Sequence, residues 1–183
     1  MHARDYLRTT AEIALEIDPI QIEAMASALH AVQGRIYVAG IGGSLANALH
    51  MAADLRKLCG KDALSPNMAE WTARANDEGL STTFAGWMSH MGTEDALFVL
   101  SVGGGTAVVS TGLVAAVDHA RSRGARVYGI VGPAGGYTAQ HADLCIKVPA
   151  PQSAMTPHTE AFQIVIIHCL VSHPLLQKVA TKW

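Results

Sequence analysis

The sequence predicts a doubly wound α/β fold, in which a mostly parallel, five-stranded sheet is flanked by helices. Short, continuously apolar runs such as residues 127–131 are typical of parallel strands that are covered on both faces. Segments with helical spacing of apolar residues lie between these runs, and such alternation is the pattern of an α/β sheet. The length of 183 residues fits one domain, so residues 1–183 are interpreted as a single unit.

Two helices are expected before the first strand. Apolar side chains recur at helical spacing between residues 5 and 32, and Pro19 marks a break. We therefore divide the chain into an N-terminal helical segment, residues 1–33, and an α/β core with a C-terminal helix, residues 34–183. Hydrophobic residues make up 50% of the chain and charged residues only 15%, so the N-terminal helices are expected to pack between subunits of a homo-oligomer.

The other elements alternate along the core. Strands are expected at residues 35–40, 96–101, 126–131 and 144–148, with a weaker strand near residues 63–68. Helices are expected at residues 44–58, 108–123, 137–142 and 159–172, the last of which ends or kinks at Pro174.

Two of these strands run into a glycine-rich turn that contains hydroxyl residues and leads to a helix. Backbone amides can crowd around an anion at such a turn, hydroxyl groups add donors, and the helix start adds partial positive charge. Both turns leave from the carboxyl ends of parallel strands, so we expect them to share one phosphate pocket. Its predicted residues are Gly42, Gly43 and Ser44 from the first turn, and Ser101, Gly103, Gly104, Gly105 and Thr106 from the second.

Several other functions are excluded or disfavoured by the sequence. Leu45 stands where the third glycine of a dinucleotide fingerprint belongs, and neither turn has the Gly-Lys-Ser/Thr ending of a P-loop, so no nucleotide cofactor is expected. A net charge of −2 with no basic patch argues against nucleic-acid binding. Three cysteines far apart and no signal peptide favour a cytoplasmic protein that does not enter a membrane.

Ionisable residues on two predicted helices are candidates for the chemistry. His50 and Asp54 are four residues apart and share a helix face, and Glu160 and His168 are eight apart on the last helix. These groups could transfer protons as general acid and base, or His50, Glu160 and His168 could hold a divalent metal such as zinc. A histidine in such an apolar helix is also often a core or interface residue, and spacing leaves these alternatives open.

The motifs resemble the SIS (sugar isomerase) domain of phosphoheptose isomerases. Residues 38–44 and 50–54 resemble that family's first glycine turn and the helix that follows, and residues 76–79 resemble its Asn-Asp-x-Gly segment. Residues 101–106 stand where the family has its second phosphate loop, and His168 where it has a histidine on the C-terminal helix. By this resemblance Asp54 takes the place of the family's glutamate, Glu160 that of a glutamine, and Asp77 joins the substrate-binding set.

The resemblance implies a homotetramer with active sites at subunit interfaces. It also implies interconversion of sedoheptulose 7-phosphate and D-glycero-D-manno-heptose 7-phosphate through an enediol, a step toward the heptose of bacterial lipopolysaccharide or capsule, with zinc in some members. Asp54, Glu160 and His168 are the expected catalytic residues. Ile41, Gly103, Gly105 and Glu160 depart from the family pattern. The alternatives are a non-catalytic phosphosugar-binding regulator or scaffold, including one that associates with a replication initiator, and an isomerase of another sugar phosphate.

Overall fold

The computed structural model describes residues 1–181 and has a central sheet of five parallel strands in the order β2-β1-β3-β4-β5. The strands are β1 (Ile36–Gly40), β2 (Ala63–Leu64), β3 (Ala96–Ser101), β4 (Arg126–Val131) and β5 (Leu144–Lys147). The register pairs Ile36 with Ala96 and Ala96 with Arg126, so the three central strands begin at one level. This sheet confirms the predicted fold class.

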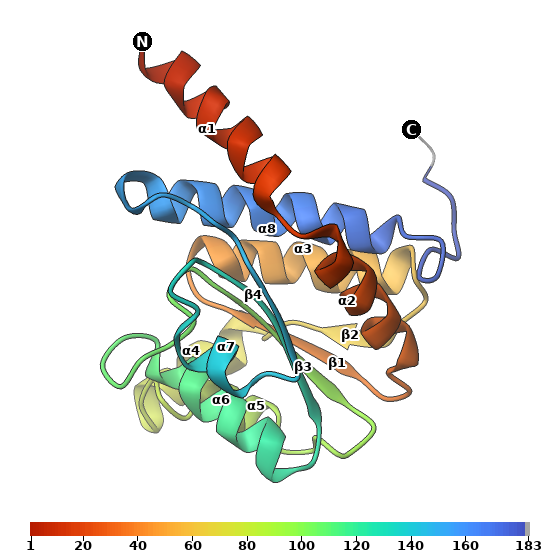
Figure 1. Cartoon of the computed structure of the whole chain (residues 1–183). Helices are drawn as coiled ribbons and strands as arrows, with labels where there is room; N and C mark the ends of the chain where they lie inside the picture. Colours follow the sequence, from red (N-terminus) through yellow and green to blue (C-terminus); the bar gives the residue numbers. More distant parts are fainter. Residues whose placement is uncertain (182–183) are drawn as a thin grey trace.

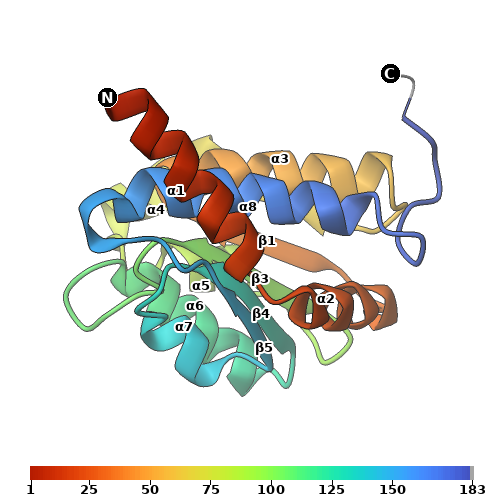
Figure 2. The ribbon, with the colours of Figure 1, turned by 45° about the horizontal axis from the view of Figure 1, so that its top comes forward.

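Helices cover both faces of the sheet (Figures 1 and 2). One face carries α2, α3 and α8, with α1 projecting beyond them, and the other carries α4 to α7. The helices are α1 (His2–Glu16), α2 (Pro19–Ala31), α3 (Gly43–Lys57), α4 (Met68–Asp77), α5 (Thr83–Trp87), α6 (Thr111–Ser122), α7 (Gly136–His141) and α8 (Met155–Val171), with a short 3₁₀ turn at Gln152–Ala154 before α8.

The central strands are buried because successive side chains point to opposite, equally covered faces. Val38 of β1 joins the apolar core under α2, α3 and α8, whereas its neighbours Tyr37 and Ala39 join the core under α5 and α6. Continuous apolar runs are therefore required in these strands, which is why they could be recognised in the sequence.

The helix starts follow local rules, with two shifts from the prediction. Pro19 is the first residue of α2, and the Asp18 side chain caps this helix by accepting a hydrogen bond from the Ile20 amide at 2.9 Å. The last helix begins at Met155 instead of residue 159, because Pro157 is tolerated in a first turn. In contrast, α6 begins at Thr111 instead of residue 108, since a turn at residues 106–109 comes before it.

The N-terminal helix extends away from the rest of the molecule (Figure 1). Ile13 is its only buried side chain, whereas Leu7 and Leu15 are 66% and 89% exposed. Among residues 1–181, no helix is long and apolar enough to cross a membrane.

Candidate functional site

The first glycine turn lies where the sheet topology leaves a crevice. From β1 the chain passes through α3 to the edge strand β2, whereas from β3 it passes through α6 to β4 on the other side. The starts of α3 and α6 therefore diverge beyond the carboxyl ends of β1 and β3, which is the usual ligand position in open α/β sheets. A pocket of about 200 Å³ opens there, lined by Ile41, Ser44, Ser101, Val102, Gly103, Gly105, Thr106, Val109 and Ser110.

The first turn is shaped by glycines and provides a buried hydroxyl group. Gly42 precedes α3 with a φ of +64°, a conformation that favours glycine, and the Leu45 and Ala46 amides both donate to its carbonyl. The amides of Gly43 and Ser44 belong to the first turn of α3, where no earlier carbonyl of the helix can accept a hydrogen bond from them. Ser44 is 1% exposed and lines the pocket, where its hydroxyl group can reach an anion.

The second turn is held by its own hydroxyl groups and by α7. The Ser101 hydroxyl accepts from the Gly104 amide at 3.0 Å, which leaves its O–H as a donor for a ligand. The Thr106 hydroxyl accepts from the amides of Val108 and Val109, so this residue mainly fixes the loop. Thr106 lines the pocket nonetheless, and its predicted role in phosphate binding stays a prediction.

The glycines of the second turn allow two loops to cross. A side chain on Gly104 would overlap the Gly135 carbonyl, and its φ is +71°. The Thr138 hydroxyl and amide both donate to the Gly104 carbonyl, at 2.8 and 2.9 Å. Close packing against the start of α7 therefore explains the glycine at residue 104, and a φ of +84° favours glycine at residue 105. A side chain at Gly103 would meet no atom within 4 Å, so packing does not explain that glycine.

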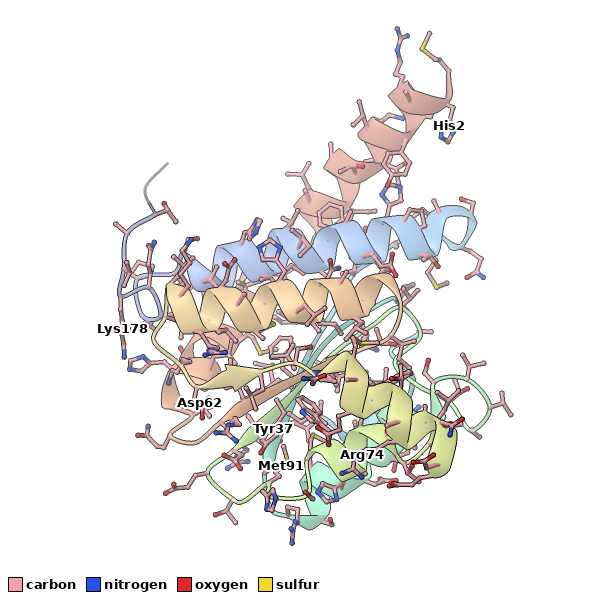
Figure 3. All side chains as sticks on the ribbon, turned by 180° about the vertical axis from the view of Figure 1, so that it is seen from behind. His2, Tyr37, Asp62, Arg74, Met91 and Lys178 are labelled. Carbon is pink, nitrogen blue, oxygen red and sulfur yellow. The ribbon has the colours of Figure 1, made fainter. Side chains whose placement is uncertain are left out.

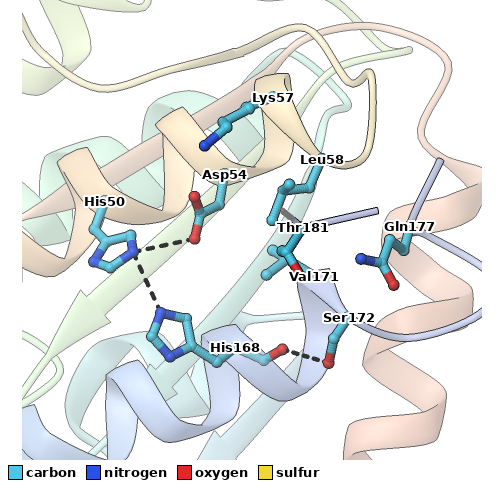
Figure 4. A pocket seen from close by; sticks show the side chains of 9 residues that line it. All are labelled: His50, Asp54, Lys57, Leu58, His168, Val171, Ser172, Gln177 and Thr181. Carbon is cyan, nitrogen blue, oxygen red and sulfur yellow. Dashed lines mark hydrogen bonds and ion pairs between the residues drawn. The ribbon is translucent and has the colours of Figure 1, made fainter. Parts of the chain in front are cut away.

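Three of the four candidate ionisable residues, His50, Asp54 and His168, come together on the outer side of α3 and α8. These helices lie side by side and run in the same direction (Figures 1 and 3). The His50 Nε2 atom lies 3.1 Å from Asp54 Oδ2 and 3.3 Å from His168 Nε2 (Figure 4). The side chain of Asp54 is 19% exposed and that of His50 is 44% exposed, so the cluster is open to a ligand.

A pocket of about 590 Å³ surrounds this cluster (Figure 4). Its remaining walls come from Lys57 and Leu58 at the end of α3, Val171 and Ser172 at the end of α8, and Gln177 and Thr181 of the C-terminal segment. That segment returns to α3, because the Lys178 and Val179 amides donate to the Leu58 carbonyl; Figure 3 labels Lys178 there.

The cluster has the donor set of a catalytic metal centre. Nitrogen atoms of His50 and His168 and a carboxylate oxygen of Asp54 lie within 4.8 Å of one another. Two imidazoles with one carboxylate are typical ligands of catalytic zinc and leave a position for substrate. The nearby Cys59 is not suited to be a ligand, because burial, and secondarily the Asp54 carboxylate, raises the pKa of its thiol to about 11.

Glu160 lies at the other end of the α3–α8 pair. A side chain on Gly43 would overlap its carboxylate, so this group covers the start of α3. The Asn47 side-chain amide donates to the Glu160 carbonyl and to Gln163 Oε1, both at 2.9 Å. Glu160 is absent from the cluster of His50, Asp54 and His168, so one chain does not bring all the predicted catalytic and metal-binding residues together.

Asp77 is also separate from the pocket lining in a single chain. It is the last residue of α4, is exposed, and accepts a hydrogen bond from the Asn76 side chain at 2.7 Å. The sequence reasoning missed Asn47, Gln177 and Thr181. Asn47 had a usable signal, because asparagine is a poor residue for a helix interior unless its side chain has a partner. Gln177 and Thr181 had no such signal in the sequence, since only tertiary folding brings the C-terminal segment to α3.

The fold and site define a class of protein, and comparison with known proteins agrees. The model of the SIS domain family matches residues 4–132, and the chain belongs to this family. Within the family its sequence is similar to phosphoheptose isomerases. That of Rhodospirillum rubrum is 36% identical over 145 residues, which cover 75% of this chain and 73% of that protein.

Solved structures show the same relationship. The phosphoheptose isomerase of Neisseria gonorrhoeae matches with a TM-score of 0.78 and 25% identity, over 93% of this chain and 92% of that chain. A phosphoheptose isomerase from Francisella tularensis matches with a TM-score of 0.80 over 97% and 95% of the two chains; at 22% identity this likeness supports the fold alone. The resemblance predicted from the glycine turns and the His50–Asp54 helix is thereby confirmed.

Proposed function

We propose that this protein is an aldose–ketose isomerase that interconverts sedoheptulose 7-phosphate and D-glycero-D-manno-heptose 7-phosphate. The observation that carries the proposal is the position of two sites on one helix. Ser44, at the start of α3, lines a pocket suited to phosphate, and Asp54, ten residues later, belongs to a carboxylate–histidine cluster. The relatives named phosphoheptose isomerase support the substrate.

The phosphate group would be held at the crossing of the two glycine turns. The amides at the start of α3 and the hydroxyl groups of Ser44 and Ser101 can donate to its oxygens. Anchoring a remote phosphate fixes the sugar so that its reacting carbons meet the acid–base residues repeatedly in one orientation.

The chemical step needs one proton moved between two carbons and one between two oxygens. Asp54 is suited to take the proton from C1 of the ketose, which gives an enediol, and, after exchange of this proton with solvent, to deliver a proton to C2 of the aldose. His168 is suited to protonate the oxygen at C2 and to accept the proton from the oxygen at C1. Atoms and charge balance, because no group leaves and the electron pair of the broken C–H bond is returned at C2.

The donor set of His50, Asp54 and His168 also fits a zinc ion, and we propose that these residues hold one when zinc is supplied. The atoms that bind the ion do not transfer protons, so the acid–base roles given above for Asp54 and His168 are those of the metal-free protein. Bound there, zinc would supply Lewis-acid polarisation of the sugar carbonyl. Within one chain Glu160 lies at the start of α3, away from these three residues. It could serve as a metal ligand, as the sequence predicts, only across a contact between two subunits.

We further propose that the active form is a homotetramer with sites between subunits, in the cytoplasm. Ser44 and Asp54 are separated by about 15 Å along the axis of α3, and their pockets share no lining residue. A second copy packed on this surface would bring its own carboxylate–histidine cluster toward the Ser44 pocket of the first. The exposed leucines of α1 provide apolar surface for such packing.

The test is conversion of sedoheptulose 7-phosphate by the purified protein, followed by chromatographic separation of the ketose and aldose phosphates. The proposal predicts approach to equilibrium from either sugar and loss of conversion in Asp54→Asn. Saturable binding without conversion would instead favour a phosphosugar-binding regulator. If the protein converted only a pentose or hexose phosphate, the proposed type of reaction would stand and the proposed substrate would be wrong.

A further inference from the structure

The carboxylate of Glu160 is an anion placed at the start of α3, where the proposed function puts the substrate's phosphate. It lies so close to Gly43 that any side chain there would overlap both of its oxygen atoms. Ile41 and Ser44, on either side of the Gly42–Gly43 pair, line the phosphate pocket. The carboxylate is therefore next to this pocket and on the side of α8.

This carboxylate is not neutralised by the protein. Glu160 takes part in none of the ion pairs formed among residues 1–181, and no side-chain hydrogen bond to its carboxylate is formed there. Its favourable neighbours are the unpaired amides and the partial positive charge at the start of α3. A bound phosphate would interact with the same amides and the same partial positive charge.

The backbone that carries Glu160 is fixed to α3. The Asn47 side-chain amide donates to the Glu160 carbonyl and to the buried side chain of Gln163. Because the backbone of residue 160 is tied to the second turn of α3, its side chain starts beside the first turn of that helix, where the carboxylate lies next to Gly43. The contact is built into the packing of the two helices.

We propose that Glu160 is a specificity-determining residue that makes the pocket discriminate against free phosphate in favour of a phosphorylated polyol. The inference rests on the proposed function. A carboxylate beside the pocket repels any phosphate dianion, so it lowers the affinity for phosphate alone. A sugar phosphate brings hydroxyl groups, which can donate to an acceptor-only carboxylate and offset this repulsion. Selectivity here comes from a repulsive element as well as an attractive one.

The experiment is a titration of the intact protein with inorganic phosphate and, separately, with sedoheptulose 7-phosphate, in the presence of a chelator so that no divalent cation bridges the anions. Three proteins are compared: wild type, Glu160→Gln and Glu94→Gln. Glu94 is an exposed glutamate just before β3, at the amino ends of the strands and so at the opposite end of the sheet from the pocket, and serves as the matched control.

We expect Glu160→Gln to bind inorganic phosphate about three- to tenfold more tightly than wild type, which is the effect of removing one partly screened charge. The gain in affinity of Glu160→Gln for sedoheptulose 7-phosphate should be smaller. The ratio of its affinity for the sugar phosphate to its affinity for inorganic phosphate should therefore be lower than that of wild type. Glu94→Gln should match wild type. Glu160→Asp, which keeps the charge, should bind phosphate no more tightly than wild type.

Unchanged or weaker phosphate binding in Glu160→Gln would overturn the inference, as would an equal gain for both ligands. In either case sugar phosphate binding by wild type would leave the proposed function standing. If neither wild type nor Glu160→Gln bound phosphate or sugar phosphate, both the phosphate site and the inference would be wrong. Far-ultraviolet circular dichroism of each variant shows that the fold is retained.

Discussion

His50 is the centre of the carboxylate–histidine cluster, since its Nε2 atom lies within 3.3 Å of both Asp54 and His168. If the three residues bind zinc, His50→Ala should lower zinc affinity at least about tenfold, because one of three protein ligands is lost. The measurement is competition with a chromophoric chelator at fixed pH.

Two further variants make the zinc measurement specific. His173→Ala removes a histidine that pairs with Glu23, and it should bind zinc as wild type does. Glu160→Gln should also retain zinc binding if the site is formed by one chain. Equal zinc affinity of wild type and His50→Ala would contradict the assignment.

Two thiols, the buried Cys59 and the half-buried Cys145, make the stability of the protein depend on alkaline pH. Burial raises the pKa of Cys59 to about 11 and that of Cys145 to about 12. The unfolded thiols ionise near their ordinary pKa, about 8.5, whereas the folded ones stay protonated. Their contribution to the free energy of unfolding is thus complete below about pH 8.5 and is lost as pH rises toward 11 and 12.

Urea unfolding at pH 8, 9 and 10.5 tests this dependence. The double variant Cys59→Ala/Cys145→Ala should lose less free energy of unfolding between pH 8 and 10.5 than wild type, although its stability at pH 8 is lower because cavities form. Equal losses in the two proteins would show that these thiols do not carry the pH dependence.

The contact between His50 and Asp54 was predicted correctly because it follows helical spacing, but the position of Glu160 away from this contact was not predicted. His50 and Asp54 are one turn apart, so they meet as expected. Glu160 and His168 share a helix but are separated by about 12 Å along it, so they cannot both meet one ion or one carbon of the same chain. Residue spacing indicates that Glu160 and His168 share one face of α8. Only the packing of α8 against α3 shows that Glu160 lies near the start of α3 and His168 near His50.

At the scale of elements, the second glycine turn depends on α7. Thr138 is fully buried and its hydroxyl donates to the Gly104 carbonyl. Thr138→Val keeps the shape and removes this hydrogen bond, so we expect a loss of about 1–2 kcal/mol of stability and weaker sugar phosphate binding.

Denaturation at a fixed protein concentration and a sugar phosphate titration measure the two effects of Thr138→Val. Ser122→Ala is a suitable control, because Ser122 lies at the far end of α6 and its hydroxyl donates only to the His119 carbonyl within that helix. Full stability and binding in Thr138→Val would mean that α7 does not support the phosphate loop.

The prediction of elements succeeded where the chain is strongly apolar and failed where it is short or mixed. The four long strands and α3 were found because continuous or periodic apolar runs define them. The short helices α4 and α5, between Met68 and Trp87, were not predicted. No residue of α4 is buried, so its sequence has no core-facing stripe to recognise.

For the whole molecule, α1 is the element that we expect to join subunits. Its Leu7 and Leu15 are largely exposed in one chain, and the helix extends away from the rest of the molecule (Figure 1). If α1 joins subunits, Leu7→Asp/Leu15→Asp should convert the oligomer to a smaller species, because charges would be placed in an apolar contact. Sedimentation velocity of wild type and variant measures this change.

The same variant tests whether sites lie between subunits. Isomerisation should fall together with oligomer mass, while the circular dichroism spectrum of the protomer is unchanged. A monomeric wild type, or an assembly that is unaffected by the two aspartates, would contradict this role of α1. An oligomer stays a prediction from composition, and its geometry could not be predicted from the sequence, since it depends on surfaces that only the folded chain presents.

The most direct test of the central claim is hydrogen exchange during the reaction in deuterated water. Wild-type protein with sedoheptulose 7-phosphate should place deuterium at C2 of the aldoheptose phosphate, as seen by nuclear magnetic resonance, and Asp54→Asn should slow this at least about a hundredfold. Conversion in wild type without any deuterium at C2 would contradict proton exchange through an enediol, and the absence of both conversion and exchange would contradict the assignment as an isomerase.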